Sequence, residues 1–184
     1  MAVETPEEFL TAVTRLRQAR LRPEIVLQEV PAPQRIAPHA LALSAEVLQD
    51  DEELATGRFV LLYDPSGQEA WEGTFRAVTF VRAALEPELG SDQLISQVGW
   101  TWLQDALLAV GARYVAAGGT VTRVVSESFG TLAERTPTVE LEVRASWSPL
   151  DDPGLHLQAW GQLLCTVAGL PPLPDGVAPL PHRR

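Results

Sequence analysis

The stretch from Gly57 to Leu85 constrains the fold of this chain more than any other part of the sequence. It reads GRFVLLYDPSGQEAWEGTFRAVTFVRAAL, so two runs rich in β-branched and aromatic residues flank the segment DPSG at residues 64–67. Turns favour Asp, Pro, Ser and Gly, whereas strands favour Val, Phe and Tyr. The stretch therefore predicts a long β-hairpin whose turn lies at residues 64–67.

A helix is predicted on the N-terminal side of this hairpin. Pro6 suits the first position of a helix, Thr5 suits its N-cap, and Glu8 follows Thr5 at the spacing of a capping box. Apolar residues then recur at helical spacing. The sequence therefore predicts a helix over residues 6–20.

Two strands are predicted between this helix and the hairpin. Residues 24–30, EIVLQEV, favour an extended chain because they are rich in β-branched side chains. Along residues 39–48, larger apolar residues alternate with smaller or polar ones, which predicts a strand with one buried face. The buried face comprises Leu41, Leu43, Ala45 and Val47.

The stretch GWTWLQDALLAVG, residues 99–111, raises the question of whether its two tryptophans form a cage for a ligand. On a helical wheel, Trp100 and Trp102 lie at opposite borders of one apolar arc, roughly 160° apart. They cannot be two walls of one cage, and we expect both to pack in the core. The adjacent glycines that follow, in AAGGTVTR, are typical of a turn between a helix and a strand.

The segment TVTRVVSESFG, residues 120–130, contains several polar and charged residues. The register of the strand pairing decides whether they face solvent or the interior. The register that we favour sets Val124 inward and places Arg123 and Glu127 in an exposed charge ladder with the predicted strand at residues 138–147. That ladder would include Glu140, Glu142 and Arg144. A slip of one residue turns both charges inward, where unpaired charges usually mark a functional site. The candidate binding residues of such a site are Arg123, Glu127, Ser126 and Ser128.

A last helix is predicted near residues 155–168, and it ends at Gly169. His156 falls within its buried stripe and Cys165 lies nearly opposite, so the two cannot form a Cys–His dyad. We expect His156 to be a core histidine with satisfied hydrogen bonds. The histidines show no paired spacing, so no metal site, cofactor or catalytic residue is predicted from them: His39, His156 and His182.

Charge and composition disfavour several classes of function. The chain has 184 residues, 46% of them hydrophobic, which suits one folded domain with a sizeable core. Its formal net charge of −10 repels phosphate backbones and disfavours nucleic acid as a partner. An RNA-associated role would depend on four arginines near the first helix that do not share one helical face: Arg15, Arg17, Arg20 and Arg22.

The sequence also indicates a compartment. Cys165 is the one cysteine of the chain, so no intrachain disulfide can form, as is usual in a reducing cytoplasm. The N-terminal residues MAVETPEEF lack the basic and apolar regions of a secretory signal, and no apolar run approaches the roughly 20 residues that cross a bilayer. We therefore expect a cytoplasmic protein without membrane contact.

Five segments of the chain carry a family resemblance: LRPEIVLQEVPAPQRIAPHALALSAEV, ELATGRFVLLYDPSGQEAWEGTFRAVTFVRA, VGWTWLQDAL, GTVTRVVSESFG and AWGQLLCTVAGLPPLP. Together they resemble the actinobacterial family known as domain of unknown function three thousand. The resemblance runs over nearly the whole chain. It implies a cytoplasmic actinobacterial protein and supplies no activity, cofactor or catalytic residue.

The predicted element order is helix, four strands, helix, two strands, helix. Because every connection between adjacent strands is short enough for antiparallel pairing, we expect an α+β domain over residues 1–169, with a proline-rich tail at residues 170–184. In this domain one antiparallel sheet of about six strands carries three helices, mainly on one face. The other face, if it is open, could bind a peptide or a small molecule.

The function predicted from these observations is a non-enzymatic binding or regulatory module. This prediction rests on a sequence that suits a packed hydrophobic core and has no recognisable set of catalytic residues. The partner of such a module would be another protein, a small molecule or a second copy in a homodimer. The alternative is an enzyme or small-molecule binder with a cleft built around Arg123 and Glu127.

Overall fold

The computed structural model describes residues 4–173. Its three α-helices are α1 (Glu7–Gln18), α2 (Ile95–Ala109) and α3 (Pro153–Val167). Its strands are β1 (Ile25–Val30), β2 (His39–Gln49), β3 (Glu52–Gln68), β4 (Gly73–Leu85), β5 (Tyr114–Ser126) and β6 (Thr138–Pro149). Short 3-10 helices lie at η1 (Glu69–Trp71), η2 (Pro87–Ser91) and η3 (Gly130–Leu132). The predicted element order is confirmed.

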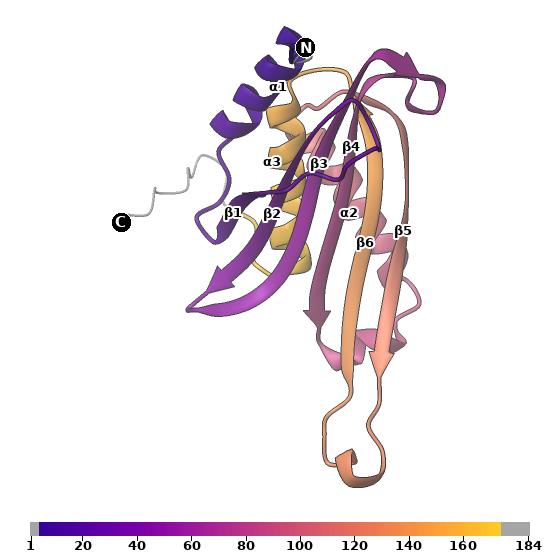
Figure 1. Cartoon of the computed structure of the whole chain (residues 1–184). Helices are drawn as coiled ribbons and strands as arrows, with labels where there is room; N and C mark the ends of the chain where they lie inside the picture. The colour runs from indigo at the N-terminus through magenta and orange to yellow at the C-terminus, as the bar shows by residue number, and fades with distance from the viewer. Residues whose placement is uncertain (1–3, 174–184) are drawn as a thin grey trace.

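The strands form one antiparallel sheet of six strands in the order β1-β2-β3-β4-β6-β5 (Figure 1). Helix α2 carries the chain from β4 past the position of β6, so β5 becomes an edge strand and β6 returns between β4 and β5. The predicted α+β fold with a single antiparallel sheet is confirmed. Strands β1 and β5 are left as its two edges.

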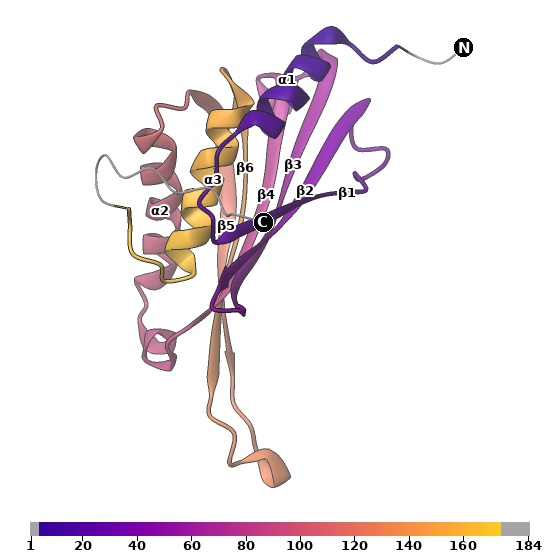
Figure 2. The same ribbon diagram turned by 90° about the vertical axis from the view of Figure 1, so that its left-hand side faces the viewer.

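Helices α2 and α3 cover one face of the sheet, and α1 lies beside α3 (Figure 2). Along β2 the residues that face these helices are the predicted alternating set, which is buried as expected: Leu41, Leu43, Ala45 and Val47. No described α-helix lies on the opposite face, where Trp71 of η1 packs with Ala42, Val60 and Leu62. We call that side the outer face.

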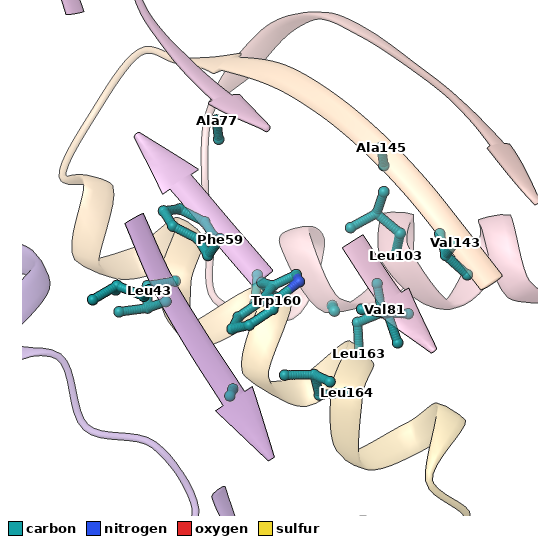
Figure 3. Packing of buried hydrophobic residues seen from close by; sticks show 14 of the residues in the cluster. Leu43, Phe59, Ala77, Val81, Leu103, Val143, Ala145, Trp160, Leu163 and Leu164 are labelled. Carbon is teal, nitrogen blue, oxygen red and sulfur yellow. The ribbon is translucent and has the colours of Figure 1, made fainter. Parts of the chain in front are cut away.

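Helix α3 packs closely on the sheet because β3 has a glycine beneath its tryptophan. A Cβ atom on Gly57 would lie 2.7 Å from Trp160 Cζ2 and 2.7 Å from the carbonyl oxygen of Phe80, both closer than side-chain carbons approach other atoms. The indole of Trp160, fully buried, occupies the space that this side chain would take (Figure 3).

Helix α3 is buried around nearly its whole circumference. The prediction placed Cys165 opposite the buried stripe, yet its exposure is 2%. The reason is tertiary: besides the sheet, α1 and Leu21 pack against α3, and the chain after α3 folds back so that the Leu170 N–H bonds to the Cys165 carbonyl oxygen.

The two tryptophans of α2 pack against the core as predicted, each half-buried. Trp100 lies under Gly119 of β5, where a Cβ atom would come within 2.8 Å of its Cζ3. The prediction that the adjacent glycines form a turn is wrong, because Gly118 and Gly119 both lie within β5. Gly119 serves instead to let the helix approach the strand.

The hairpin predicted from residues 57–85 is present, but its turn is not at residues 64–67. Those residues belong to β3, where the pairing with β4 shifts between Tyr63 and Gln68. The Asp64 carboxylate accepts the backbone N–H of Ser66 at 3.0 Å, so the bend is absorbed as an irregularity of the strand. The chain reverses later, through η1 and Glu72, whose φ of 52° is left-handed.

The start of α1 also differs from the prediction. Pro6 itself is the N-cap and no side chain caps the helix, so the expected capping box of Thr5 and Glu8 does not form. Glu8 instead accepts a 2.6 Å hydrogen bond from the hydroxyl of Tyr63 on β3. This bond fastens the start of α1 to the sheet.

The C-terminal part of the described chain lies on the domain. Leu170 is buried, and the carbonyl oxygen of Pro171 accepts a 2.8 Å hydrogen bond from Arg22 Nη1. The rest of the predicted tail, residues 174–184, and with it His182, lies outside the described residues. None of the helices within residues 4–173 has the length and hydropathy needed to span a bilayer.

Candidate functional site

The register of β5 on β6 contradicts the predicted charge ladder. Arg123 lies opposite Leu141, whereas Glu140 and Glu142 lie opposite Val124 and Thr122. Opposite residues of an antiparallel pair share one face, so Arg123 points to the side of the helices. It is only half-buried, because the β5–β6 hairpin extends beyond the helices at this end (Figures 1 and 2).

The other predicted site residues follow along the same hairpin. Ser126 ends β5 opposite Thr138, Glu127 is exposed just after the strand, and Ser128 is half-buried. Arg123 donates a hydrogen bond to the carbonyl oxygen of Asp92, and among the described residues no bond joins it to Glu127. A binding cleft around these residues stays a prediction.

His156 is a core histidine with both ring nitrogens hydrogen-bonded, as predicted. It is fully buried, its Nδ1 accepts a 2.9 Å bond from the indole N–H of Trp147, and its Nε2 lies 2.6 Å from Asp151 Oδ1. Because Nδ1 accepts, the ring proton is on Nε2 and is donated to Asp151. Asp151 in turn accepts the backbone N–H of Arg113 at 2.9 Å. This network joins β6 to the start of α3.

Acidification is expected to destabilise the protein through His156. Burial lowers the pKa of His156 below its ordinary value, although Asp151 opposes the shift. The unfolded chain therefore takes up a proton near pH 6.5 that the folded chain resists, and the free energy of unfolding falls as the pH drops below that value. The loss attributable to this group can reach about 1.4 kcal/mol per pH unit.

Urea unfolding of the natural chain and of a His156→Gln variant at matched pH values measures this effect. The difference in unfolding free energy between the two is expected to shrink as the pH falls from about 7.5 to about 5. A difference that stays constant over this range, or that widens on acidification, would contradict the assignment of a neutral histidine.

Cys165 and His39 show no arrangement for nucleophilic catalysis. Burial raises the pKa of the Cys165 thiol to about 11, so it stays protonated at neutral pH. His39 packs against the rings of Phe9 and Tyr63, with ring centroids 5.6 and 6.1 Å away. Within residues 4–173 no group of three potential metal-ligating side chains comes together.

A cleft of about 360 Å³ lies between α1 and the start of α3, and three carboxylates line it. Each carboxylate already has a structural partner: Glu8 binds Tyr63, Asp151 binds His156, and Asp152 caps α3 by accepting the N–H of Gly154 at 2.8 Å. The three carboxylates of this cleft therefore serve the fold.

The outer face contains a hollow of about 290 Å³ next to the β5 edge. Its lining residues come from three strands: Val78, Thr79, Gly118, Gly119, Thr120, Arg144, Ala145 and Ser146. The hollow exists because Gly118 has no side chain, and a Cβ atom placed there would meet nothing within 4 Å. We call this depression the outer hollow.

Arg76 of β4 does not itself line the outer hollow, but it contacts Ser146, which does. Its Nη2 donates to Ser146 Oγ at 2.8 Å, and its Nη1 donates to the carbonyl oxygen of Ala116 at 2.7 Å and to Ser148 Oγ at 3.0 Å. All three acceptors are neutral oxygens, and no described carboxylate pairs with this half-buried guanidinium. Burial lowers the pKa of Arg76, but a guanidinium keeps its charge at neutral pH.

Arg144 of β6 supplies a second guanidinium at the outer hollow. It lies over the ring of Phe80, 4.8 Å from the centroid, which fixes a side chain that is otherwise 63% exposed. Its one ion pair within residues 4–173, with Glu142 at 3.5 Å, is long, and the arginine side of the pair is exposed. In a chain whose net charge is −10, one guanidinium thus lines the outer hollow and a second contacts its lining residue Ser146.

The arginines near α1 do not gather into a comparable site. Arg17 pairs with Glu29 and Arg22 pairs with Glu24, at 3.2 and 3.0 Å. Arg20 is exposed, and Arg15 lies in the cleft between α1 and α3.

Comparison with known proteins gives one family and nothing more specific. A family model described as "Protein of unknown function (DUF3000)" matches residues 5–178. No curated protein and no solved structure matches the chain.

Proposed function

We propose that this chain, which belongs to the DUF3000 family, is a non-enzymatic binding module that holds a small organic carboxylate in the outer hollow. The observation that carries the proposal is Arg76, a half-buried guanidinium whose hydrogen bonds all go to neutral oxygens. Taking a charge partly out of water is costly unless an anion pairs with it. A ligand carboxylate would supply that anion.

The geometry suits a carboxylate in particular. The three bonds of Arg76 leave two of its five N–H groups free, and Arg144, which lines the hollow, has donors of its own. A carboxylate that bridges two guanidiniums makes charge-assisted hydrogen bonds, which are about twice as strong as neutral ones.

The ligand is expected to be small, with a single charge. The net charge of −10 repels polyanions at a distance, whereas the binding of a monoanion depends mainly on its attraction to the nearby arginines. The hollow of about 290 Å³ is close to the smallest ligand sites of proteins. Val78, which lines the hollow and is 39% exposed, provides an apolar surface for the rest of the molecule.

The side chains of the outer hollow favour binding over catalysis. None of its eight lining residues is a histidine, a cysteine or an acid, which are the usual groups that transfer protons or attack a substrate. A guanidinium stays protonated, so it orients and neutralises an anion without acting as a base.

Benzoate and benzamide form a matched pair of probes, because they share their shape and differ in charge. In a two-dimensional NMR titration, benzoate is expected to shift the amide resonances of Gly118, Gly119 and Thr120 in a saturable way, and benzamide is not. Shifts scattered over the whole surface, or equal effects of both probes, would refute a carboxylate site.

Two variants test the same site without altering the core. Gly118→Val fills the hollow and is expected to abolish benzoate binding, since its new side chain enters open space. Arg144→Gln is expected to weaken binding about tenfold or more, because it removes a charge-assisted hydrogen bond. Arg20→Gln, an equal change of charge at an exposed position, is the control and should leave binding unchanged.

A further inference from the structure

We propose that a second copy of this chain pairs with the edge of β5 to form a symmetric dimer. The proposal is independent of ligand binding in the outer hollow. It begins with a contrast between the two edges of the sheet, because an uncovered edge strand offers free N–H and C=O groups to any other strand.

The β1 edge is protected in the way that natural sheets protect their edges. β1 is only six residues long, Pro31 follows it directly and Pro23 lies just before it. It also carries a charged pair across its surface, between Glu29 and Arg17. Short length, proline and charge all oppose the addition of another strand.

The β5 edge lacks the short length and the prolines that protect β1. β5 is 13 residues long, contains no proline and has a single charged residue, Arg123. Its last residues are rich in β-branched side chains, and Val125 is 50% exposed. Although η2 contacts the end of β5, the β5–β6 hairpin extends beyond the α-helices, so a second chain can approach its outer edge (Figures 1 and 2).

One register of an antiparallel pair of β5 strands satisfies both copies equally. If Val125 lies opposite Val125 of the second copy, Arg123 lies opposite Glu127 of that copy, and Glu127 opposite its Arg123. Opposite residues share a face, so one two-fold axis produces two ion pairs. Within one copy Glu127 is exposed and has no hydrogen bond or ion pair with a described residue, so it is available for this contact.

Exposed apolar side chains surround the same stretch. Leu94 is 62% exposed next to the segment that Arg123 contacts, and Phe129 is 75% exposed just beyond β5. Large apolar groups clustered beside an open strand edge are typical of an association surface. The pairing would occupy residues 122–128 and leave Gly118 and the outer hollow free.

Sedimentation velocity over a range of concentrations tests the dimer and its register together. The natural chain is expected to show a concentration-dependent dimer. Arg123→Glu and Glu127→Arg, each alone, place like charges opposite one another twice and are expected to weaken the dimer roughly 10- to 100-fold. The double variant R123E/E127R restores opposite charges across the axis, so it is expected to recover the dimer.

Glu134→Arg, at an exposed position in the same hairpin connection, is the matched control and should dimerise like the natural chain. Circular dichroism of each variant confirms that it is folded. A monomer at every concentration would overturn the proposal. So would a dimer that the single charge reversals leave intact, or one that the double variant fails to restore.

Discussion

A Gly57→Ala variant is expected to lose about 3 kcal/mol of unfolding free energy, because it overpacks the closest contact between α3 and the sheet. The added methyl group would lie 2.7 Å from the indole of Trp160 and 2.7 Å from a backbone oxygen of β4. A flexible side chain could move away, but a strand backbone and a fully buried indole cannot. For a chain of this length the melting temperature should fall by about 6–12 °C.

Gly118→Ala is the control for this experiment. It makes the same chemical change within a strand of the same sheet, but its new methyl group meets nothing within 4 Å. Its unfolding free energy is expected to stay within about 0.5 kcal/mol of the natural value. Equal losses in the two variants would show that the contact with Trp160 does not explain the effect, since the lower entropy that alanine gives the unfolded chain favours folding.

A His156→Ala variant is expected to lose about 4 kcal/mol of unfolding free energy, for two reasons that add. It leaves a cavity in a fully buried site, and it leaves two polar groups without their hydrogen-bond partner. The indole N–H of Trp147 loses its acceptor, and the Asp151 carboxylate loses its donor at 2.6 Å. Chemical denaturation at neutral pH measures the loss.

His39→Ala is the matched control, because His39 is half-buried and has only ring contacts with Phe9 and Tyr63. It is expected to cost about 1 kcal/mol. Trp147→Phe separates the two causes in the His156 variant, since it keeps most of the ring volume and removes only the N–H donor. A His156→Ala variant as stable as His39→Ala would show that the buried network contributes little.

The candidate site shows how far sequence reasoning reaches. The alternation along β4 places Arg76, Val78 and Phe80 on one side, opposite the buried Ala77 and Val81. That pattern is visible in the sequence and marks them as outward. The contact of Arg76 with Ser146, which lines the outer hollow, could not be predicted, because the two residues are 70 positions apart in the sequence. Gly118, beside which the hollow lies, belongs to the glycine pair that the sequence pattern predicts as a turn.

The charged residues of β5 illustrate the same limit. The sequence posed two registers for Arg123 and correctly identified register as the deciding question. The structure has the register that was not favoured, yet it does not bury an unpaired charge, because the hairpin runs past the end of the helices. Whether a strand position is inside or outside depends on where its covering helix stops, which a local pattern does not contain.

The sequence by itself determined the order of the elements, the single antiparallel sheet and the buried faces of β2 and α2. Helical periodicity and strand alternation are properties of neighbouring residues, so they can be read locally. Only the tertiary structure decided the register of β5, the true turn of the β3–β4 hairpin, the burial of Cys165 and the pair of arginines at the outer hollow. Each of these depends on contacts between distant segments, whose relative positions are set by the packing of the whole sheet against its helices.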